Sequence, residues 1–216
     1  MAHKVHPKSA RLPITLDWDS KWFDLKNLAK NVGDDSRIRT MIVKKLGARA
    51  AIDRIVIERR RTTVTITIFT GRPGVIIGRA GTGINELRSF VEKKIFKGAP
   101  NQDVKLLVSQ IKQPELSAAF VAQNIGEQLV KRIAFRRAAK QAIERTMAQG
   151  AKGIKVIISG RLGGAEIARS EKFSEGKLPL SHFNSNVDYA VHHAVTTFGV
   201  LGVKVWIYKG DLVREI

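Results

Sequence analysis

Two glycines bracket a short turn that could hold a phosphate group. The turn is Gly78-Arg79-Ala80-Gly81, which follows the apolar run Val75-Ile76-Ile77. Glycine permits positive φ and has no side chain to keep a phosphate away from the backbone N–H groups. A helix that begins near Thr82 would direct its N-terminal N–H groups at the same space. The turn therefore predicts an anion-binding or RNA-binding site.

Two other interpretations of this turn stay open. The glycines could mark only a tight turn between helices, since Gly71 and Gly74 have the same spacing. A nucleotide site is the second alternative, but Glu86 stands where a G-x-G-x-x-G pattern needs its third glycine, and no G-K-[ST] follows. The position between two predicted helices, after a basic hairpin, favours RNA.

A second group of basic residues lies on one side of a predicted helix over residues 135–149. At 100° per residue, Arg136, Arg137 and Lys140 fall within an arc of about 100°. No acidic residue occurs between Gln128 and Ile143. A solvated charged face is the alternative, but counterion release favours phosphate contact. The predicted contacts are Arg132, Arg136, Arg137 and Lys140.

A glycine-rich segment, residues 159–169, forms the third group. Its glycines could let an RNA backbone approach, and Arg161 and Arg169 would supply charge. A plain bend between two strands is the alternative interpretation.

Catalytic and metal chemistry are not predicted. The chain has no cysteine, and His192 and His193, adjacent on a predicted strand, would face opposite sides of a sheet. The residues around Ser181, His182 and Asp188 do not have the spacing of a catalytic triad. We expect no enzyme activity, no metal, no cofactor and no small-molecule substrate.

The charge of the chain indicates a polyanionic partner. Lys and Arg number 38 against 19 Asp and Glu, so the formal net charge of the 216 residues is +19. Such an excess is self-repulsive unless a polyanion neutralises it. No apolar run approaches the roughly 18–20 residues that span a bilayer, and the N-terminus lacks the apolar core of a secretory signal. Nucleic acid in the cytosol is the expected partner, with no membrane.

Hydrophobic periodicity divides the chain near Gln113-Pro114. Before it, spacing predicts a helix over 38–46 and a hairpin with one buried face over 52–68. A short helix over 75–77, a helix over 84–95 and a strand over 104–111 follow. After it, spacing predicts two helices, over 115–132 and 135–149. Four strands follow them, over 154–159, 165–173, 188–197 and 203–209.

This order of elements, with V-I-I-G-R-A-G between the last two helices of the first half, resembles the type II KH domain (αββααβ). Further motifs resemble the bacterial type of the ribosomal protein S three family almost from end to end. They are Lys4-Val5-His6-Pro7, residues 54–59, Arg72-Pro73-Gly74, Phe135-Arg136-Arg137-Ala138, and residues 150–156, 159–169 and 202–207. The expected fold is α+β: a type II KH domain followed by two helices packed on a mostly antiparallel four-stranded sheet.

The resemblance implies a structural protein of the small ribosomal subunit head. It would bind small-subunit (16S-type) rRNA and line the path by which mRNA enters, where Arg136, Arg137 and Lys140 help unwind mRNA. By family analogy its neighbours are ribosomal proteins ten and fourteen, and it is not a homo-oligomer. One departure is Ala80, where the family often has a basic residue. The expected RNA-binding residues are Arg59, Arg60, Arg61, Arg72, Gly78, Arg79, Ala80, Gly81, Arg161 and Arg169.

The expected domains are an N-terminal arm (1–37), the KH domain (38–112) and a C-terminal ribosomal domain (113–216). A free-standing KH regulator of mRNA and a nuclease are the competing functions. The ribosome could be cytoplasmic or that of an organelle.

Overall fold

The computed structural model describes residues 5–12, 14–95 and 103–211. The chain divides into two compact units. Trp18–Lys112 forms the first, and Met1–Asp17 together with Gln113–Ile216 forms the second. The residues expected to form an N-terminal arm, 1–37, are therefore shared between the two units, with the division after Asp17.

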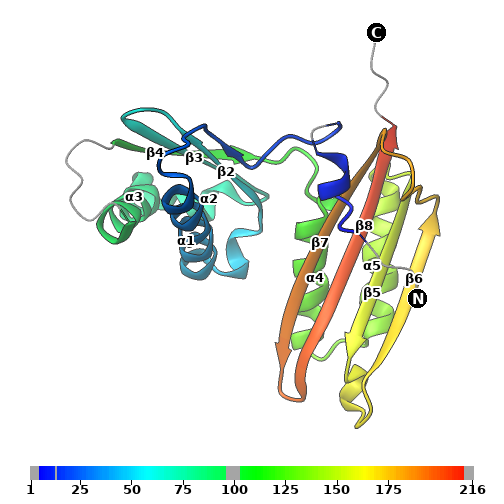
Figure 1. Cartoon of the computed structure of the whole chain (residues 1–216). Helices are drawn as coiled ribbons and strands as arrows, with labels where there is room; N and C mark the ends of the chain where they lie inside the picture. The colour runs from blue at the N-terminus through cyan, green and yellow to red at the C-terminus, as the bar shows by residue number, and fades with distance from the viewer. Residues whose placement is uncertain (1–4, 13, 96–102, 212–216) are drawn as a thin grey trace. The chain divides into compact units, whose positions relative to one another are not determined.

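The first unit has the element order of a type II KH domain (Figure 1). Its four-stranded sheet has the order β1-β2-β3-β4, in which β2 and β3 are antiparallel and the outer pairs are parallel. The elements are β1 (Ser20–Lys21), α1 (Leu28–Leu46), β2 (Ile52–Arg59), β3 (Thr63–Thr70), α2 (Pro73–Ile77), α3 (Thr82–Ile95) and β4 (Asp103–Gln110).

Alternation along β3 builds the core of this unit. Val64, Ile66 and Ile68 are buried, whereas the threonines between them are partly exposed. A period of two places every second side chain on the same face, and here that face packs against α1 and α3. The predicted hairpin with one buried face is thus confirmed.

Helix α1 is one continuous helix, whereas the sequence indicated a short helical stretch through Leu25, Leu28 and Val32 and a separate helix from Ile38 to Leu46. Its polar first half contains Asp35, which is buried and accepts hydrogen bonds from Ser20, Trp22 and Arg59. A carboxylate can be buried when several donors bond to it, so this helix buries a polar side chain where hydrophobic periodicity would require an apolar one.

The second unit packs two helices on an antiparallel sheet of order β6-β5-β8-β7. The four-stranded antiparallel sheet is as predicted. Strand β6 begins later than expected, at Arg169 rather than Ala165, because the chain first bends through a short 3-10 helix, η5 (Leu162–Gly164). The other elements are α4 (Ala118–Val130), α5 (Phe135–Ala148), β5 (Gly153–Gly160), β6 (Arg169–Gly176), β7 (Ser185–Thr196) and β8 (Gly199–Asp211).

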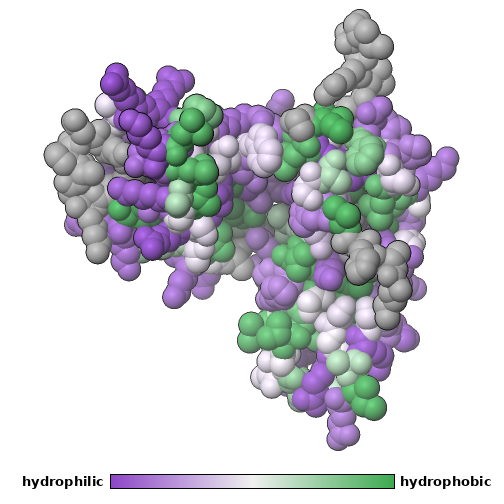
Figure 2. Space-filling view, viewed as in Figure 1, coloured by the Kyte–Doolittle hydropathy of each residue, from purple (hydrophilic) through white to green (hydrophobic). Residues whose placement is uncertain are grey.

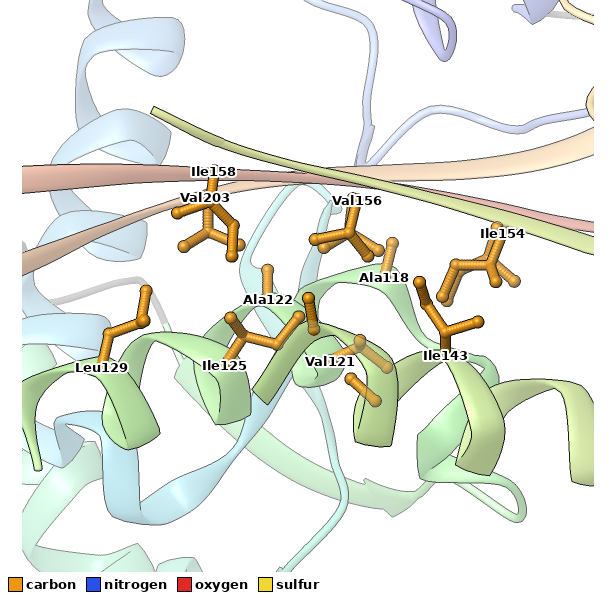
Figure 3. Packing of buried hydrophobic residues seen from close by; sticks show 14 of the residues in the cluster. Ala118, Val121, Ala122, Ile125, Leu129, Ile143, Ile154, Val156, Ile158 and Val203 are labelled. Carbon is orange, nitrogen blue, oxygen red and sulfur yellow. The ribbon is translucent and has the colours of Figure 1, made fainter. Parts of the chain in front are cut away.

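Both helices of this unit cover the same face of the sheet. Figure 3 shows Ile154, Val156 and Ile158 of β5 pointing toward the helices, where they meet Ile125 of α4 and Ile143 of α5. All of these side chains are at most 5% exposed. Burying a side chain of this size contributes about 1.5–3 kcal/mol, so this layer is the main source of stability in the unit.

The N-terminal segment is fastened to the second unit by Arg11, which is 1% exposed. Its guanidinium donates to the carbonyl of Ser185 at 2.8 Å and to that of His182 at 2.9 Å. Lys8 adds an ion pair with Asp188 at 2.9 Å. Among the helices that the structure describes, none combines the length and apolarity needed to cross a membrane.

Candidate nucleic-acid interface

The glycine turn lies where the sequence predicted it, between α2 and α3, and contains a short 3-10 helix, η3 (Arg79–Gly81). Three of its residues have positive φ: Gly78 (70°), Ala80 (50°) and Gly81 (79°). Arg79 and Ala80 are exposed. The turn therefore presents backbone and a cation to solvent ahead of the N-terminus of a 14-residue helix, α3.

The turn is anchored by one apolar side chain rather than by three. Ile76 is 1% exposed, but Val75 and Ile77 are 49% and 40% exposed. A helix as short as α2 can turn only part of its surface to the core, so the apolar run before the turn contributes one buried side chain.

Close backbone packing explains two of the glycines. A Cβ at Gly78 would lie 2.9 Å from the nitrogen of Gly83, and a Cβ at Gly83 would lie 2.7 Å from the carbonyl oxygen of Ile76. Both distances are shorter than real Cβ contacts. Gly83 is outside the G-x-x-G pattern, and its role could not be found from spacing alone.

We expect Gly83→Ala to destabilise the first unit by about 1–3 kcal/mol, because the added methyl group overpacks against backbone that cannot rotate away. The measurement is urea denaturation of the full chain. Gly74→Ala is the matched control, since a Cβ there meets nothing within 4 Å, and it should be neutral or slightly stabilising. Equal midpoints for the two variants would contradict the packing argument.

The basic hairpin turn does not join the glycine turn. Arg60 and Arg61 lie between β2 and β3, whereas Arg72 lies beyond the far end of β3. Eight residues of strand separate the two ends by about 23 Å. Arg59 is committed elsewhere, since its Nε donates to Asp35 Oδ1 at 2.8 Å and the side chain is 9% exposed. Of the predicted arginines, Arg72 and Arg79 are therefore the ones near the turn.

Helix α5 presents the second basic surface. Arg136 donates to both carboxylate oxygens of Glu171 on β6 at 3.3 Å, and this hydrogen bond holds the pKa of Glu171 below its usual value. The sequence suggested that no acidic residue neutralises this face, but Glu171 comes from another element. Within the described ranges, Arg137 and Lys140 are exposed and have no acidic partner.

The arginines of the glycine-rich segment bond to other residues of the protein. Arg161 donates to the carbonyls of Ala165 at 2.9 Å and Phe198 at 3.4 Å. Arg169 pairs with Glu171 at 3.3 Å. A Cβ at Gly160 would lie 2.8 Å from the side chain of Leu201. This geometry favours the strand-to-strand bend over an RNA cradle for this segment.

Arg132 lies just after α4, has a φ of 60° and lines the same cavity as Arg161. It is exposed, and the cavity has a volume of about 370 Å³ and other lining residues that include Leu129, Leu162 and Leu201. Its guanidinium is thus available to an anion at the junction of α4 and α5.

Histidine and acidic side chains do not gather into a metal site anywhere in the described part of the chain. His192 packs under α4, where a Cβ at Gly126 would lie 2.3 Å from its ring, and burial lowers the pKa of His192. His193 is exposed on the opposite face of β7. The two adjacent rings therefore cannot share one ion, as strand geometry predicted.

Comparison with known proteins gives two family matches. The model for the KH domain matches residues 37–116, and that for "Ribosomal protein S3, C-terminal domain" matches residues 125–207. The chain is also similar over its full length to proteins named small ribosomal subunit protein uS3. Identity is 48% with that of Carboxydothermus hydrogenoformans and 49% with that of Caldicellulosiruptor bescii, each covering 100% of this chain and 95% of the relative. That of Clostridium botulinum (strain Okra) is 46% identical over 98% of this chain and 93% of the relative.

Proposed function

Since this chain belongs to the family of small ribosomal subunit protein uS3, we propose that it binds small-subunit rRNA in the head and lines the channel through which mRNA enters. The family is one of ribosomal structural proteins rather than enzymes, and the KH domain is an RNA-binding module. Its work is therefore to hold and position RNA. It needs no cofactor for this, because the moving ribosome supplies the energy.

The observation that carries the mRNA role is the exposed face of α5. Arg137 and Lys140 stand three residues apart on one side of the helix, and no acidic side chain of the described residues pairs with them. Arg136, the third residue of the group, is tied to Glu171. We assign mRNA contact chiefly to Arg137 and Lys140, and to a smaller extent to Arg132, which lies just after α4. Arg136 contributes less, because its guanidinium is paired with Glu171.

The KH turn supplies a contact to the RNA backbone. Arg79 offers one charge, and residues 78–81 let a phosphate approach the N-terminus of α3. Ala80 adds no charge where the resembled family often has a basic residue, so the electrostatic share of this contact is small. Arg72 lies directly before α2 and adds a second cation to this end of the unit.

The two halves divide this work in our proposal. Residues 38–112 act as the RNA-binding KH domain, and residues 113–216 form the ribosomal domain, which would meet mRNA and neighbouring proteins. By analogy with the resembled family, those neighbours are ribosomal proteins ten and fourteen, and the ribosome is cytoplasmic.

A salt titration of the full chain tests this function. The protein should co-sediment with small subunits, and its affinity for single-stranded RNA should fall with a slope of about −0.7 in log K against log[salt] for each contacted phosphate. Ala80→Lys should steepen that slope by about 0.7, whereas Ala80→Ser, which adds no charge, should leave it unchanged.

Three results would count against the proposal. An affinity for RNA that does not depend on salt would show that the chain makes no phosphate contacts. Recovery of the protein with transcripts in ribosome-free fractions would favour a free-standing regulator. Cleavage of RNA or DNA by the purified chain, lost on a single substitution, would favour a nuclease.

A further inference from the structure

Large apolar side chains are exposed where the chain enters helix α1. Phe23 and Leu25, just before the helix, are 86% and 77% exposed, and Leu28 and Val32 in its first turns are 53% and 54% exposed. Figure 2 shows hydrophobic side chains gathered over the segment that leads into α1, beside a hydrophilic area. Single exposed apolar residues are ordinary, but four in so short a stretch form a patch. We call these four residues the α1 patch.

Helix geometry continues the uncharged surface along α1. At 100° per residue, Val32, Ser36, Thr40 and Val43 fall within an arc of about 80°, and all four are exposed. No charged residue between Leu28 and Leu46 falls within that arc. The solvent side of a helix in a soluble protein is normally polar or charged, and this chain has a net charge of +19. An uncharged solvent side therefore indicates a partner that covers it.

The border of the α1 patch is basic. Lys26 and Lys30 are exposed and have no acidic partner in the part of the chain that the structure describes. The carboxylates of the same segment are used inside the unit. Asp24 accepts a hydrogen bond from the side-chain amide of Asn27 at 3.0 Å, and Asp35 is buried. The border thus offers cations to a partner and keeps its carboxylates for itself.

A hollow of about 580 Å³ adjoins the patch, since Phe23 is among its lining residues. The free cations that line this hollow are Lys30, Arg60 and Arg61. Arg60 and Arg61 lie in the turn between β2 and β3, and neither has an acidic partner within the described ranges. Of the acidic lining residues, Asp24 is bonded to Asn27 and Asp34 lies 3.9 Å from Arg37. One end of the apolar patch is therefore distinctly cationic.

We infer that the α1 patch binds a segment of another protein whose apolar side chains are flanked by acidic residues. Protein interfaces combine an apolar centre with a polar rim, and the free lysines and arginines of this rim are complementary to carboxylates. RNA fits the surface less well, because only Phe23 of the four residues has a ring on which a base could stack. A second copy of this chain would bring like charges together, so the partner is a different protein.

This inference rests on the proposed function, in which the chain works beside other proteins of the small subunit, and it names the surface and the chemistry of one such contact. It uses none of the residues assigned to RNA under that function. The glycine turn lies between α2 and α3, and Arg137 and Lys140 belong to the other compact unit. The α1 patch can therefore fail as a docking surface while the proposed function stands.

The test places the photocrosslinking residue p-benzoylphenylalanine at Val32 of the full chain. Small subunits are reconstituted from 16S-type rRNA and purified bacterial small-subunit proteins without uS3, and the variant chain is added. We expect a crosslink to a protein, at a segment with acidic residues beside apolar ones. The same residue at Val75 is the control, because Val75 is also about half exposed in the first unit but lies next to the glycine turn. From Val75 we expect a crosslink to rRNA.

Each other result of the Val32 crosslink counts against the inference. A crosslink to rRNA, to a second copy of this chain or to a protein segment without acidic residues would overturn it, and so would the absence of any crosslink. An rRNA crosslink from Val75 in the same experiment would show that the proposed function still stands. If the chain does not join the subunits at all, the proposed function is wrong and the inference falls with it.

Leu28→Ser/Val32→Ser tests the apolar contribution to this contact. Both side chains are about half exposed, so the fold should be retained, and hydrogen exchange would verify this. At limiting concentration the variant should enter small subunits about tenfold less well than the wild-type chain, because two apolar side chains no longer contribute to docking.

Leu107→Ser/Val75→Ser is the matched control for this variant, since it removes a leucine and a valine of similar exposure, 53% and 49%, from the same unit. It should enter small subunits as the wild-type chain does. Equal entry of the two double variants would overturn the inference.

Discussion

Arg11→Met should lower the free energy of unfolding of the second unit by about 4 kcal/mol, near the upper limit for a single substitution. The arginine is 1% exposed, and its guanidinium lies within hydrogen-bond distance of five acceptors, three of which share the two hydrogens of Nη2. All five acceptors are backbone carbonyls, and no carboxylate is among them. The acceptor residues are Pro7, Pro179, Leu180, His182 and Ser185.

The cost arises because methionine fills most of the same space but donates nothing. Each buried carbonyl that loses its donor costs about 1–3 kcal/mol. Two of the five acceptors, the carbonyls of Ser185 and Pro7, are in buried bonds, whereas the other three are partly exposed to water. The segment 179–185, which leads from the β6–β7 connection into the start of β7, would also lose its link to the N-terminal segment. The Lys8–Asp188 ion pair, 2.9 Å long, would then be the main remaining fastening of residues 5–11.

Hydrogen exchange read peptide by peptide is the appropriate measurement, because it reports on the two units separately. Protection should fall in β7 and β8 and stay unchanged in β2 and β3. Arg145→Met is the control, since that arginine is exposed on α5 and its loss should change stability by less than about 0.5 kcal/mol. Equal protection in the Arg11 and Arg145 variants would show that Arg11 does not hold the segment.

Local patterns were sufficient to predict most of the fold. The alternation of Val64, Ile66 and Ile68 with threonines reports directly on which face of β3 is buried, because burial and the period of a strand are both local. The joining of the two predicted helical stretches into the single helix α1 was not predictable in this way. The buried position between them, Asp35, is polar and accepts a hydrogen bond from Arg59, 24 residues further along the chain.

The same limit applied to the basic residues. Composition showed that cations are in excess, but not which ones are free. Arg136 donates a hydrogen bond to Glu171, 35 residues away, and Arg161 donates one to the carbonyl of Phe198, 37 residues away. Arg11, whose partner Ser185 is 174 residues away, carried no local signal of importance. Contacts of this range require the three-dimensional structure.

The face of the second sheet that is turned away from α4 and α5 is an intermediate case. Its strands were predicted, and alternation alone places Lys155 on the side opposite Ile154 and Val156. What the sequence did not supply was the register between strands, which brings Lys172, Ile157 and Lys204 into one row. A charge pattern across a sheet becomes visible only when its strands are aligned.

Arg137→Ala/Lys140→Ala should leave small subunits able to assemble but slow translation through structured mRNA by roughly fivefold or more. Losing two phosphate contacts at about 0.5–1 kcal/mol each removes about 1–2 kcal/mol of binding free energy to mRNA. A loss of that size changes the ratio of bound to unbound mRNA at this site by a factor of about 5–30. The measurement is the rate of passage through an mRNA hairpin, compared with the rate on an unstructured message of equal length.

Arg136→Ala separates this effect from a general loss of charge. Its guanidinium is already paired with Glu171 at 3.3 Å, so removing it should slow passage less than removing either Arg137 or Lys140. Lys44→Ala/Lys93→Ala removes the same number of charges from the other unit and should not slow passage through the hairpin. If the Arg137/Lys140 variant instead fails to enter small subunits, the two residues anchor rRNA. Because both roles need exposed cations on α5, assembly is the observation that distinguishes them.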